Sequence, residues 1–158
     1  MILYHGSPIA IQHPDLSFAR ERTDFGKGFY ATPFREQAIS WARRFKHRTG
    51  FGHVCEFRVC EHKLRKNCSV LEFEDYSDSW LSFIISCRSG LDESTYDVVI
   101  GGVANDKVFD TVELVQNGLI DRFEALRRLQ YKQPNLQVCL LSQRVIDTYL
   151  LFLSCEVI

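Results

Sequence analysis

The segment from Asp24 to Thr32 constrains the fold of this chain more than any other stretch. It reads DFGKGFYAT, so that two glycines flank a lysine and two aromatic residues follow directly. Glycine permits backbone conformations and close approaches that other residues resist, and aromatic side chains offer flat faces on which a planar, cationic ring can stack. The segment predicts a sharp turn into a short strand, beside a bulky ligand or the core. Composition alone favours the core.

Short strands and helices follow one another irregularly along the rest of the chain. Apolar runs and alternation predict strands at 2–5, 29–31, 54–60, 70–73, 97–100, 136–141 and 152–157. Apolar stripes and capping residues predict helices at about 33–45, 80–88, 108–117, 121–129 and 143–150, with Thr32, Asp78, Asp121 and Ser142 as N-caps. Because no regular βαβ alternation occurs, the predicted fold class is α+β. No linker divides the 158 residues, so a single domain spanning 1–158 is expected.

Charge and hydropathy exclude several classes of function. The formal net charge is −1, which argues against a dedicated nucleic-acid binder, and the cluster of Arg43, Arg44, Lys46 and Arg48 is interpreted as the solvated face of its helix. No apolar run approaches the roughly 20 residues that a membrane span needs, so no membrane partner is expected. The first ten residues, MILYHGSPIA, do not resemble a secretory leader. The expected location is cytoplasmic.

Six cysteines occur, at positions 55, 60, 68, 87, 139 and 155. The absence of a leader favours reduced, mostly buried thiols over disulfides. Cys55, Cys60, His62 and Cys68 lie close enough in sequence to raise the question of zinc. The chain has no C-x₂-C pair, however, and the spacing matches none of the usual structural zinc sites. No metal is expected.

The segment Tyr4-His5-Gly6-Ser7 changes the interpretation of residues 24–32. Together the two segments resemble the ADP-ribosyltransferase superfamily, in the branch that includes the poly(ADP-ribose) polymerases. There a His-Gly ends the first strand and a Phe-Gly-Lys-Gly-aromatic-Tyr segment opens the second. The resemblance implies a split antiparallel β-sandwich with flanking helices that binds NAD⁺.

More closely, the chain resembles an uncharacterised bacterial family within that superfamily, domain of unknown function 3990. The further motifs that carry this resemblance are Gln37-Ala38, Trp41-Ala42, Trp80 to Phe83, Tyr96 to Gly101 and Ala104-Asn105-Asp106. It therefore extends from Leu3 to about Leu153.

The resemblance implies a role in NAD⁺ binding for each motif residue. His5 would hydrogen-bond a hydroxyl of the adenosine ribose, Gly6 would offer its backbone N–H and C=O to the nicotinamide amide, and Tyr30 would stack on the nicotinamide ring. Trp41 would cover the other ring face, although it also suits the core. The implied NAD⁺-binding set is His5, Gly6, Ser7, Lys27, Gly28, Tyr30, Trp41 and Arg88. In this set Lys27 and Arg88 would meet the pyrophosphate, and Ser7 would either assist or cap a turn.

The third catalytic position departs from the polymerase pattern. Those enzymes place a Glu at the start of a late strand, where it bonds the nicotinamide ribose, whereas this chain has Gln137. An amide can hold the ribose but brings no negative charge and cannot act as a base. The implied catalytic set is His5, Tyr30 and Gln137, and Gln137→Glu is expected to keep NAD⁺ binding and to maintain or raise nicotinamide release. The alternative is a Gln137 side chain that points to solvent.

Three aspartates are further candidates near these motifs. Asp24 precedes the glycine-rich turn, and Asp97 and Asp106 flank the Gly101-Gly102 break. Each can orient an acceptor or serve as a base. Asp97 and Asp106 are more simply explained as caps of a strand end and of a helix.

The function that the resemblance implies is an NAD⁺-dependent mono-ADP-ribosyltransferase, without elongation of a poly(ADP-ribose) chain. Its acceptor would be a protein, a nucleic acid or a small molecule. Small bacterial domains of this type resemble toxins encoded beside a neutralising antitoxin. The alternatives are a module that binds NAD⁺ or ADP-ribose without turnover, an NAD⁺ glycohydrolase, and an RNA 2′-phosphotransferase-like enzyme. The last needs further arginines poised on phosphate, and the sequence presents no convincing set.

Overall fold

A computed structural model describes residues 1–91, 95–104, 108–129 and 135–158. The strands are β1 (Ile2–Ser7), β2 (Phe29–Ala31), β3 (His53–Val59), β4 (Val70–Glu72), β5 (Val98–Gly101), β6 (Gln137–Leu140) and β7 (Leu150–Val157). The helices are α1 (Arg35–Thr49), α2 (Glu61–Asn67), α3 (Asp78–Ser89), α4 (Val108–Gln116), α5 (Arg122–Leu129) and α6 (Gln143–Tyr149), with a 3₁₀ turn, η1, at Leu16–Phe18. The α+β prediction is confirmed.

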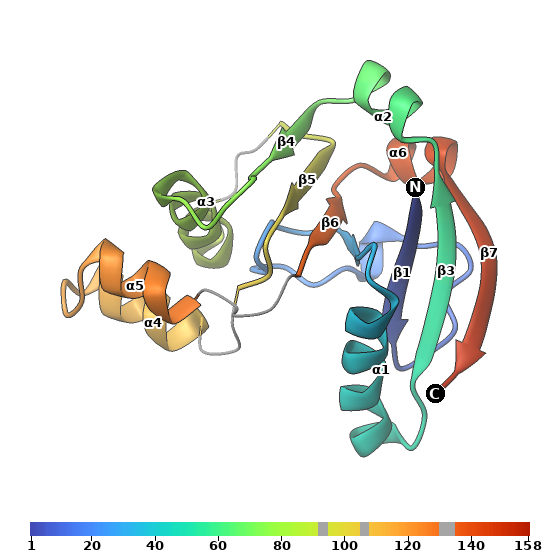
Figure 1. The fold of residues 1–158 in the computed structure, drawn as a ribbon, viewed down its shortest axis with the longest axis horizontal. Helices are drawn as coiled ribbons and strands as arrows, with labels where there is room; N and C mark the ends of the chain where they lie inside the picture. Colours follow the sequence, from blue (N-terminus) through green and yellow to red (C-terminus); the bar gives the residue numbers. More distant parts are fainter. Residues whose placement is uncertain (92–94, 105–107, 130–134) are drawn as a thin grey trace.

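Two separate sheets organise the molecule (Figure 1). Sheet A has the strand order β1-β3-β7, and sheet B has the order β2-β6-β5-β4. Every pairing is antiparallel except that of β4 with β5. Helix α1 lies along sheet A, whereas α3, α4 and α5 lie on the sheet B side of the molecule (Figure 1).

The two sheets are joined at one isolated bridge between β1 and the end of β2. Tyr4 N–H donates to the Thr32 carbonyl at 2.7 Å, and Thr32 N–H donates to the Tyr4 carbonyl at 2.9 Å. Because no further bridge is formed between these segments in the described part of the chain, β1 and β2 diverge on either side of this pair. We refer to the place where residues 5–7 separate from residues 29–31 as the β1–β2 split.

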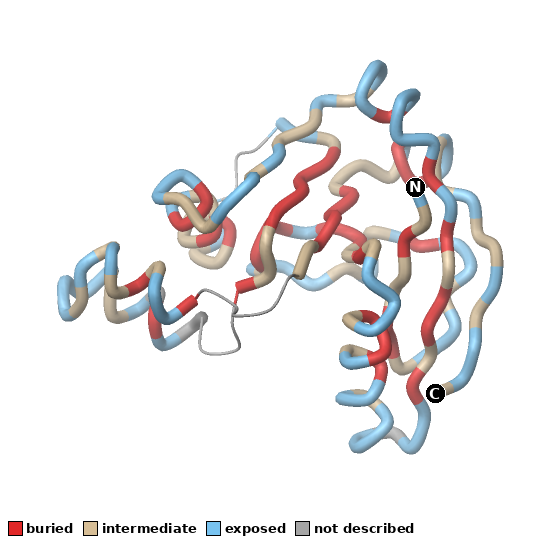
Figure 2. The backbone as a smooth tube through the Cα atoms, in the orientation of Figure 1, coloured by how far each residue is buried: buried red, intermediate tan, exposed pale blue. Residues whose placement is uncertain are grey.

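Buried residues alternate with more exposed ones along several strands (Figure 2), and their side chains form three clusters. One cluster contains inward residues of both sheets, including Leu3, Phe29, Phe57 and Leu140. A second forms on the other face of sheet B, where residues of β5 and β6 pack with helices α3 and α5. The third, built around Ala38, Ala42 and Val54, holds α1 against sheet A.

Helix starts and one whole helix differ from the sequence prediction. Helix α2 was not predicted, because its sequence EHKLRKN buries only Leu64 and so carries no apolar stripe. Helix α1 begins at Arg35 rather than at Pro33, and the hydroxyl of Thr32 accepts from Phe34 N–H at 3.1 Å. Ser77, not Asp78, is the N-cap of α3. Asp121 does cap α5, since its carboxylate accepts from Glu124 N–H at 2.8 Å.

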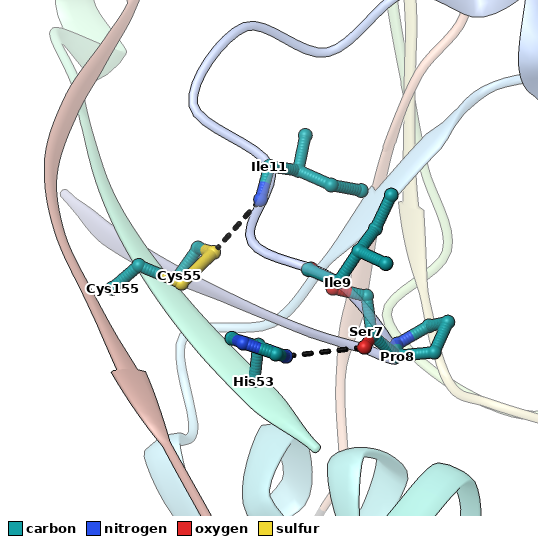
Figure 3. The surroundings of a disulfide bond; sticks show 7 residues. All are labelled: Ser7, Pro8, Ile9, Ile11, His53, Cys55 and Cys155. Carbon is teal, nitrogen blue, oxygen red and sulfur yellow. Dashed lines mark hydrogen bonds between the residues drawn. A yellow bond between two sulfur atoms is a disulfide. The ribbon is translucent and has the colours of Figure 1, made fainter. Parts of the chain in front are cut away.

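The prediction of six reduced thiols is wrong, because Cys55 and Cys155 form a disulfide (Figure 3). The two residues face each other on the neighbouring strands β3 and β7, a placement that brings two Cβ atoms close. Their separation of 100 residues explains why spacing did not reveal the pair. Disulfides persist mainly in oxidising compartments, so this pair does not favour the expected cytoplasmic location. Among the described residues no helix combines the length and apolarity needed to cross a bilayer.

Candidate functional site

The β1–β2 split frees backbone groups that a continuous sheet would pair. In an antiparallel ladder, alternate residues direct their N–H and C=O groups to the same neighbour. Since Tyr4 directs both groups to Thr32, Gly6 directs its own to the same side, toward Tyr30. A continuous ladder would next pair Gly6 with Tyr30. Instead His5 Nδ1 lies 2.6 Å from the Tyr30 carbonyl oxygen and occupies that acceptor.

Gly6 therefore presents an unused donor and acceptor to the split. Neither its N–H nor its C=O has a hydrogen-bond partner among the described residues. Glycine is required here for a packing reason, because a Cβ would collide with the Ala38 carbonyl oxygen and lie 2.9 Å from Ala42 N on helix α1. Trp41 lies beside the same point, its own Cβ 3.0 Å from the place that such an atom would occupy. The half-buried Trp41 belongs to none of the three apolar clusters of the described chain, so core packing does not explain it.

His5 is held as a neutral imidazole of one tautomer. A carbonyl oxygen only accepts, so the Nδ1 that contacts Tyr30 carries the proton and Nε2 is left as an acceptor. Burial lowers the pKa of His5, and the hydrogen bond to the Tyr30 backbone opposes this only in part. The ring also packs against Phe29, with ring centres 4.5 Å apart. This geometry suits a histidine that accepts a hydrogen bond from a ligand hydroxyl.

Tyr30 is fixed through its hydroxyl to the glycine-rich loop. The hydroxyl donates to the Gly26 carbonyl at 2.8 Å, accepts from Phe25 N–H at 2.8 Å and lies 2.9 Å from the Thr23 hydroxyl. Burial raises the pKa of Tyr30 well above its ordinary value, so the donor stays protonated. The side chains of Phe29 and Tyr30 point to opposite faces of β2. The His5 ring packs on Phe29, so His5 contacts Tyr30 through its backbone carbonyl and not through its ring.

Gln137 is buried and does not point to solvent, with 3% of its surface exposed. It precedes Cys139 by two residues, and Cys139 pairs with Tyr30, so Gln137 and Tyr30 share one face of sheet B. Its Nε2 donates to Asp24 Oδ2 at 3.0 Å and to the Gly102 carbonyl at 3.4 Å. A carboxylate thus lies beside the Gln137 amide.

Asp24 is itself buried and is paired with Arg88 of helix α3. Arg88 Nε donates to Asp24 Oδ1 at 3.1 Å, and Nη2 donates to the same oxygen. Ala104 N–H donates to Oδ2 at 3.3 Å. The side chains are 8% exposed for Asp24 and 17% for Arg88, which makes this a largely buried ion pair beside Gln137.

Comparison with known proteins identifies the family. The family model described as "Protein of unknown function (DUF3990)" matches residues 1–152. The chain belongs to this family. No curated protein and no solved structure matches this DUF3990 protein significantly.

The other predicted NAD⁺-binding residues of the DUF3990 chain are placed as follows. Ser7 is buried and donates to the Ile9 carbonyl at 2.6 Å, the turn role weighed from the sequence. Lys27 pairs with Glu21 at 3.7 Å and lines a depression of about 280 Å³ beside the glycine-rich loop. Gly28 abuts β6, where a Cβ would collide with the Cys139 sulfur and lie 2.9 Å from the Leu140 carbonyl, so packing explains this glycine. Arg88 faces Asp24 rather than standing alone.

Of the remaining candidate acids of the DUF3990 chain, Asp97 lies outside this cluster. Asp97 accepts from Ser69 N–H at 3.0 Å and from Arg144 at 3.3 Å, which is the strand-end role expected for it. Asp106 lies outside the described residues. Within the described part of the chain no three His, Cys, Asp or Glu side chains converge as metal ligands.

Sequence reasoning named Asp24 and Gln137 separately but missed that they are partners. They are 113 residues apart, and only the pairing of β6 with β2 and β5 brings them together. The one signal in the sequence was an aspartate directly before a glycine-rich turn. Such an aspartate, if the fold buries it, needs a cationic or hydrogen-bond-donating partner.

Proposed function

We propose that this DUF3990 protein is an NAD⁺-dependent mono-ADP-ribosyltransferase of the ADP-ribosyltransferase superfamily. The observation that carries the proposal is the pair of unused backbone groups of Gly6 in the β1–β2 split. A primary carboxamide, such as that of nicotinamide, offers a complementary acceptor and donor on one planar group. It can replace the peptide of Tyr30 that a continuous ladder would have placed there.

The surroundings of Gly6 support a flat, cationic ring. Trp41 adjoins Gly6 on one side, and Tyr30 supplies a second aromatic side chain from β2. Aromatic faces attract pyridinium-like cations by about 0.5–2 kcal/mol each. His5 Nε2 is an acceptor for a ribose hydroxyl, in agreement with the role that the family resemblance implies.

The proposed chemistry is breakage of the glycosidic bond of NAD⁺. The bond between ribose C1′ and the nicotinamide nitrogen breaks, and the nitrogen keeps the electron pair and leaves as neutral nicotinamide. The ribose passes through an oxocarbenium-like state, as in glycoside hydrolysis, and an acceptor atom bonds to C1′ and loses its proton. Because the leaving group is already good, catalysis is mainly positioning and electrostatic stabilisation, for which Gln137 is the polar group proposed to lie beside the ribose.

Incubation with NAD⁺ labelled in its adenosine half tests the proposal. We expect nicotinamide release together with label on a macromolecule from cell extract, and Trp41→Ala should lower release by about ten-fold through weaker binding. Phe18→Ala is the matched control, because Phe18 is an aromatic side chain that is 86% exposed on η1. Release without labelled acceptor would instead indicate a glycohydrolase. A protein that neither binds nor cleaves NAD⁺ contradicts the proposal.

A second candidate is a module that holds NAD⁺ or ADP-ribose without turnover. One observation favours it: Gln137 brings no charge, and the nearby carboxylate of Asp24 is already paired with Arg88. Calorimetric binding of NAD⁺ that leaves nicotinamide intact over hours would select this alternative.

The biological role proposed with the transferase is that of a bacterial toxin with a cognate antitoxin, by analogy with the resembling domains alone. A mass-spectrometric search for ADP-ribose adducts in cells that express the protein would identify the acceptor. Growth arrest that depends on Trp41 and is absent from the Trp41→Ala strain is the expected result. Growth at the wild-type rate in both strains contradicts the toxin role.

A further inference from the structure

The orientation of the Gln137 amide is determined by what surrounds its nitrogen. Both neighbours of Nε2, Asp24 Oδ2 at 3.0 Å and the Gly102 carbonyl oxygen at 3.4 Å, are pure acceptors. An amide turned by 180° would place its oxygen against a carboxylate and a carbonyl, where it would be repelled. The nitrogen end is therefore fixed toward the Asp24 loop.

The oxygen end of the same amide is consequently the free end. Oε1 accepts no hydrogen bond from any residue in the described part of the chain, whereas every fully buried side-chain polar atom there has a partner. Oε1 thus remains accessible at the first residue of β6, on the face of sheet B that carries Tyr30. An amide oxygen held in this way is a fixed negative dipole end.

The buried side chain of Asp24 is held in place by two partners other than Gln137, namely Arg88 and Ala104. Arg88 occupies Oδ1, and Ala104 N–H and Gln137 Nε2 share Oδ2. The arginine contacts Oδ1 and leaves Oδ2, the oxygen that faces Gln137, to the two N–H donors. The two carboxylate oxygens therefore have different partners: Oδ1 binds the arginine, and Oδ2 accepts from the Gln137 amide and the Ala104 N–H.

We propose that Asp24 is a positioning residue of this site, which orients the Gln137 amide so that Oε1 faces the ribose of bound NAD⁺. This inference rests on the proposed function and explains why the third position holds an amide. A glutamate at 137 would set a second carboxylate about 3 Å from Asp24, and like charges so close disfavour joint ionisation. The expectation from sequence that Gln137→Glu maintains or raises nicotinamide release is thereby reversed.

A double-mutant cycle on nicotinamide release tests the coupling of the two residues. Asp24→Asn removes the fixed acceptor, and Gln137→Glu introduces the competing carboxylate. Each should lower kcat by about ten-fold while KM for NAD⁺ changes by less than about three-fold, because orientation and charge act in the transition state. The double variant Asp24→Asn with Gln137→Glu exchanges the amide and the carboxylate and should recover kcat to within about three-fold of wild type. A merely structural role for Asp24 predicts no such recovery.

Thermal melts provide a readout that does not depend on NAD⁺. The carboxylate introduced by Gln137→Glu should have a pKa raised in the folded protein, since Asp24 repels its charge. A raised acid pKa stabilises the fold at low pH, and this stability is lost as pH rises above about 4.3, the ordinary value for glutamate. The melting temperature of Gln137→Glu should accordingly fall relative to wild type between about pH 4.5 and 7. In the double variant this relative fall should disappear.

Asp97→Asn is the matched control, because Asp97, directly before β5, is another aspartate that pairs with an arginine but lies away from Gln137. It should change neither kcat nor the pH dependence of Gln137→Glu. A Gln137→Glu protein with wild-type kcat and wild-type melting across this pH range overturns the proposal. A wild-type protein that cleaves no NAD⁺ but still shows the coupled melts would overturn the proposed function, and with it the catalytic consequence of Asp24, while the orientation of Gln137 stands.

Discussion

The candidate site has two groups of residues, here called its walls: those of β1, and those of β6 with the glycine-rich loop and its partner Arg88. The two walls are built by different means. The β1 wall presents His5 and Gly6, and it contains no formal charge, because burial keeps the imidazole neutral and the reactive groups of Gly6 are backbone amides. The wall formed by β6 and the glycine-rich loop contains Gln137, Asp24 and Arg88, with a full ion pair among them. In the proposed site the β1 wall offers backbone groups for recognition, whereas the other wall holds charged side chains in place.

This difference indicates how each wall will respond to substitution. Recognition through backbone groups depends on a close approach to the backbone, so the β1 wall should be disrupted when a side chain is added there. A buried ion pair depends on both partners, so the opposite wall should fail when one charge is removed. Substitutions on both walls can test this division, from the largest expected effect to the smallest.

Gly6→Ala should produce the largest effect. The added methyl group collides with the Ala38 carbonyl oxygen and crowds Ala42 N, which are backbone atoms that cannot turn aside. We expect a loss of about 3 kcal/mol or more in the free energy of unfolding, the upper range for overpacking, measured by chemical denaturation. Gly50→Asn is the control, because no atom lies within 4 Å of a Cβ there and Asn tolerates its φ of +82°. An unchanged unfolding midpoint in Gly6→Ala would show that α1 does not press on β1.

Arg88→Ala should be the next most damaging change. It leaves the carboxylate of Asp24 buried without its cation, a situation that costs about 3–5 kcal/mol in fully buried pairs and somewhat less here because Arg88 is partly exposed. The control is Arg122→Ala, whose partner Asp78 is 66% exposed, and it should cost under about 1 kcal/mol. Equal losses for the two variants would remove the contrast between the walls.

Two substitutions of Tyr30 distinguish its role in holding the glycine-rich loop from its proposed role in binding the ligand. Tyr30→Phe removes the hydroxyl that fixes Phe25 and Gly26 and should cost about 1–2 kcal/mol of stability, while NAD⁺ affinity in calorimetry stays within about three-fold. Tyr30→Ala should in addition weaken NAD⁺ by about 1–2 kcal/mol or more. If Tyr30→Phe and Tyr30→Ala bound NAD⁺ equally well, the ring would have no part in recognition.

The smallest expected effect is a pH dependence from His5. Because its folded pKa lies below 6.5, the unfolded chain takes up a proton first as pH falls from about 7, and the stability that neutral His5 contributes declines. The melting temperature of wild type should therefore fall more steeply between about pH 7 and 5 than that of His5→Gln. Exposed His13→Gln should leave the wild-type slope in place. Parallel curves for wild type and His5→Gln would contradict the desolvation of His5.

Local patterns were sufficient to predict most elements of the fold. Alternation in the segment around Phe57 and the apolar stripe around Ala38 reflect single buried faces, and both segments fold as predicted. Helix α2 was not predicted, because a surface helix with one buried residue has no apolar periodicity to detect. Trp41 lies beside Gly6, a proximity that the family resemblance implied and that local patterns alone did not predict.

Relations between distant segments were not predictable in the same way. The Cys55–Cys155 disulfide and the contact of Asp24 with Gln137 both depend on strand register, which one sequence does not reveal. The burial of Gln137 likewise follows from its place in β6 between β2 and β5. The consequence concerns chemistry more than fold, because the contact with Asp24 leads us to propose the opposite effect of Gln137→Glu from the one expected from the sequence.

The order in which the strands are synthesised has a consequence for when the site can exist. Sheet A is completed by β7 and sheet B is held together by β6, so both depend on residues from the last quarter of the chain. A nascent chain emerging from the ribosome carries His5, Gly6 and Tyr30 early, and β1 can pair with β3. Strand β2 lacks its partner β6, and β3 lacks its second partner β7, until residues 137–157 are made. Long-range pairing of this kind is slow to form. Sheets A and B therefore cannot be completed until residues 137–157 have been made, and a chain interrupted before them lacks both strands.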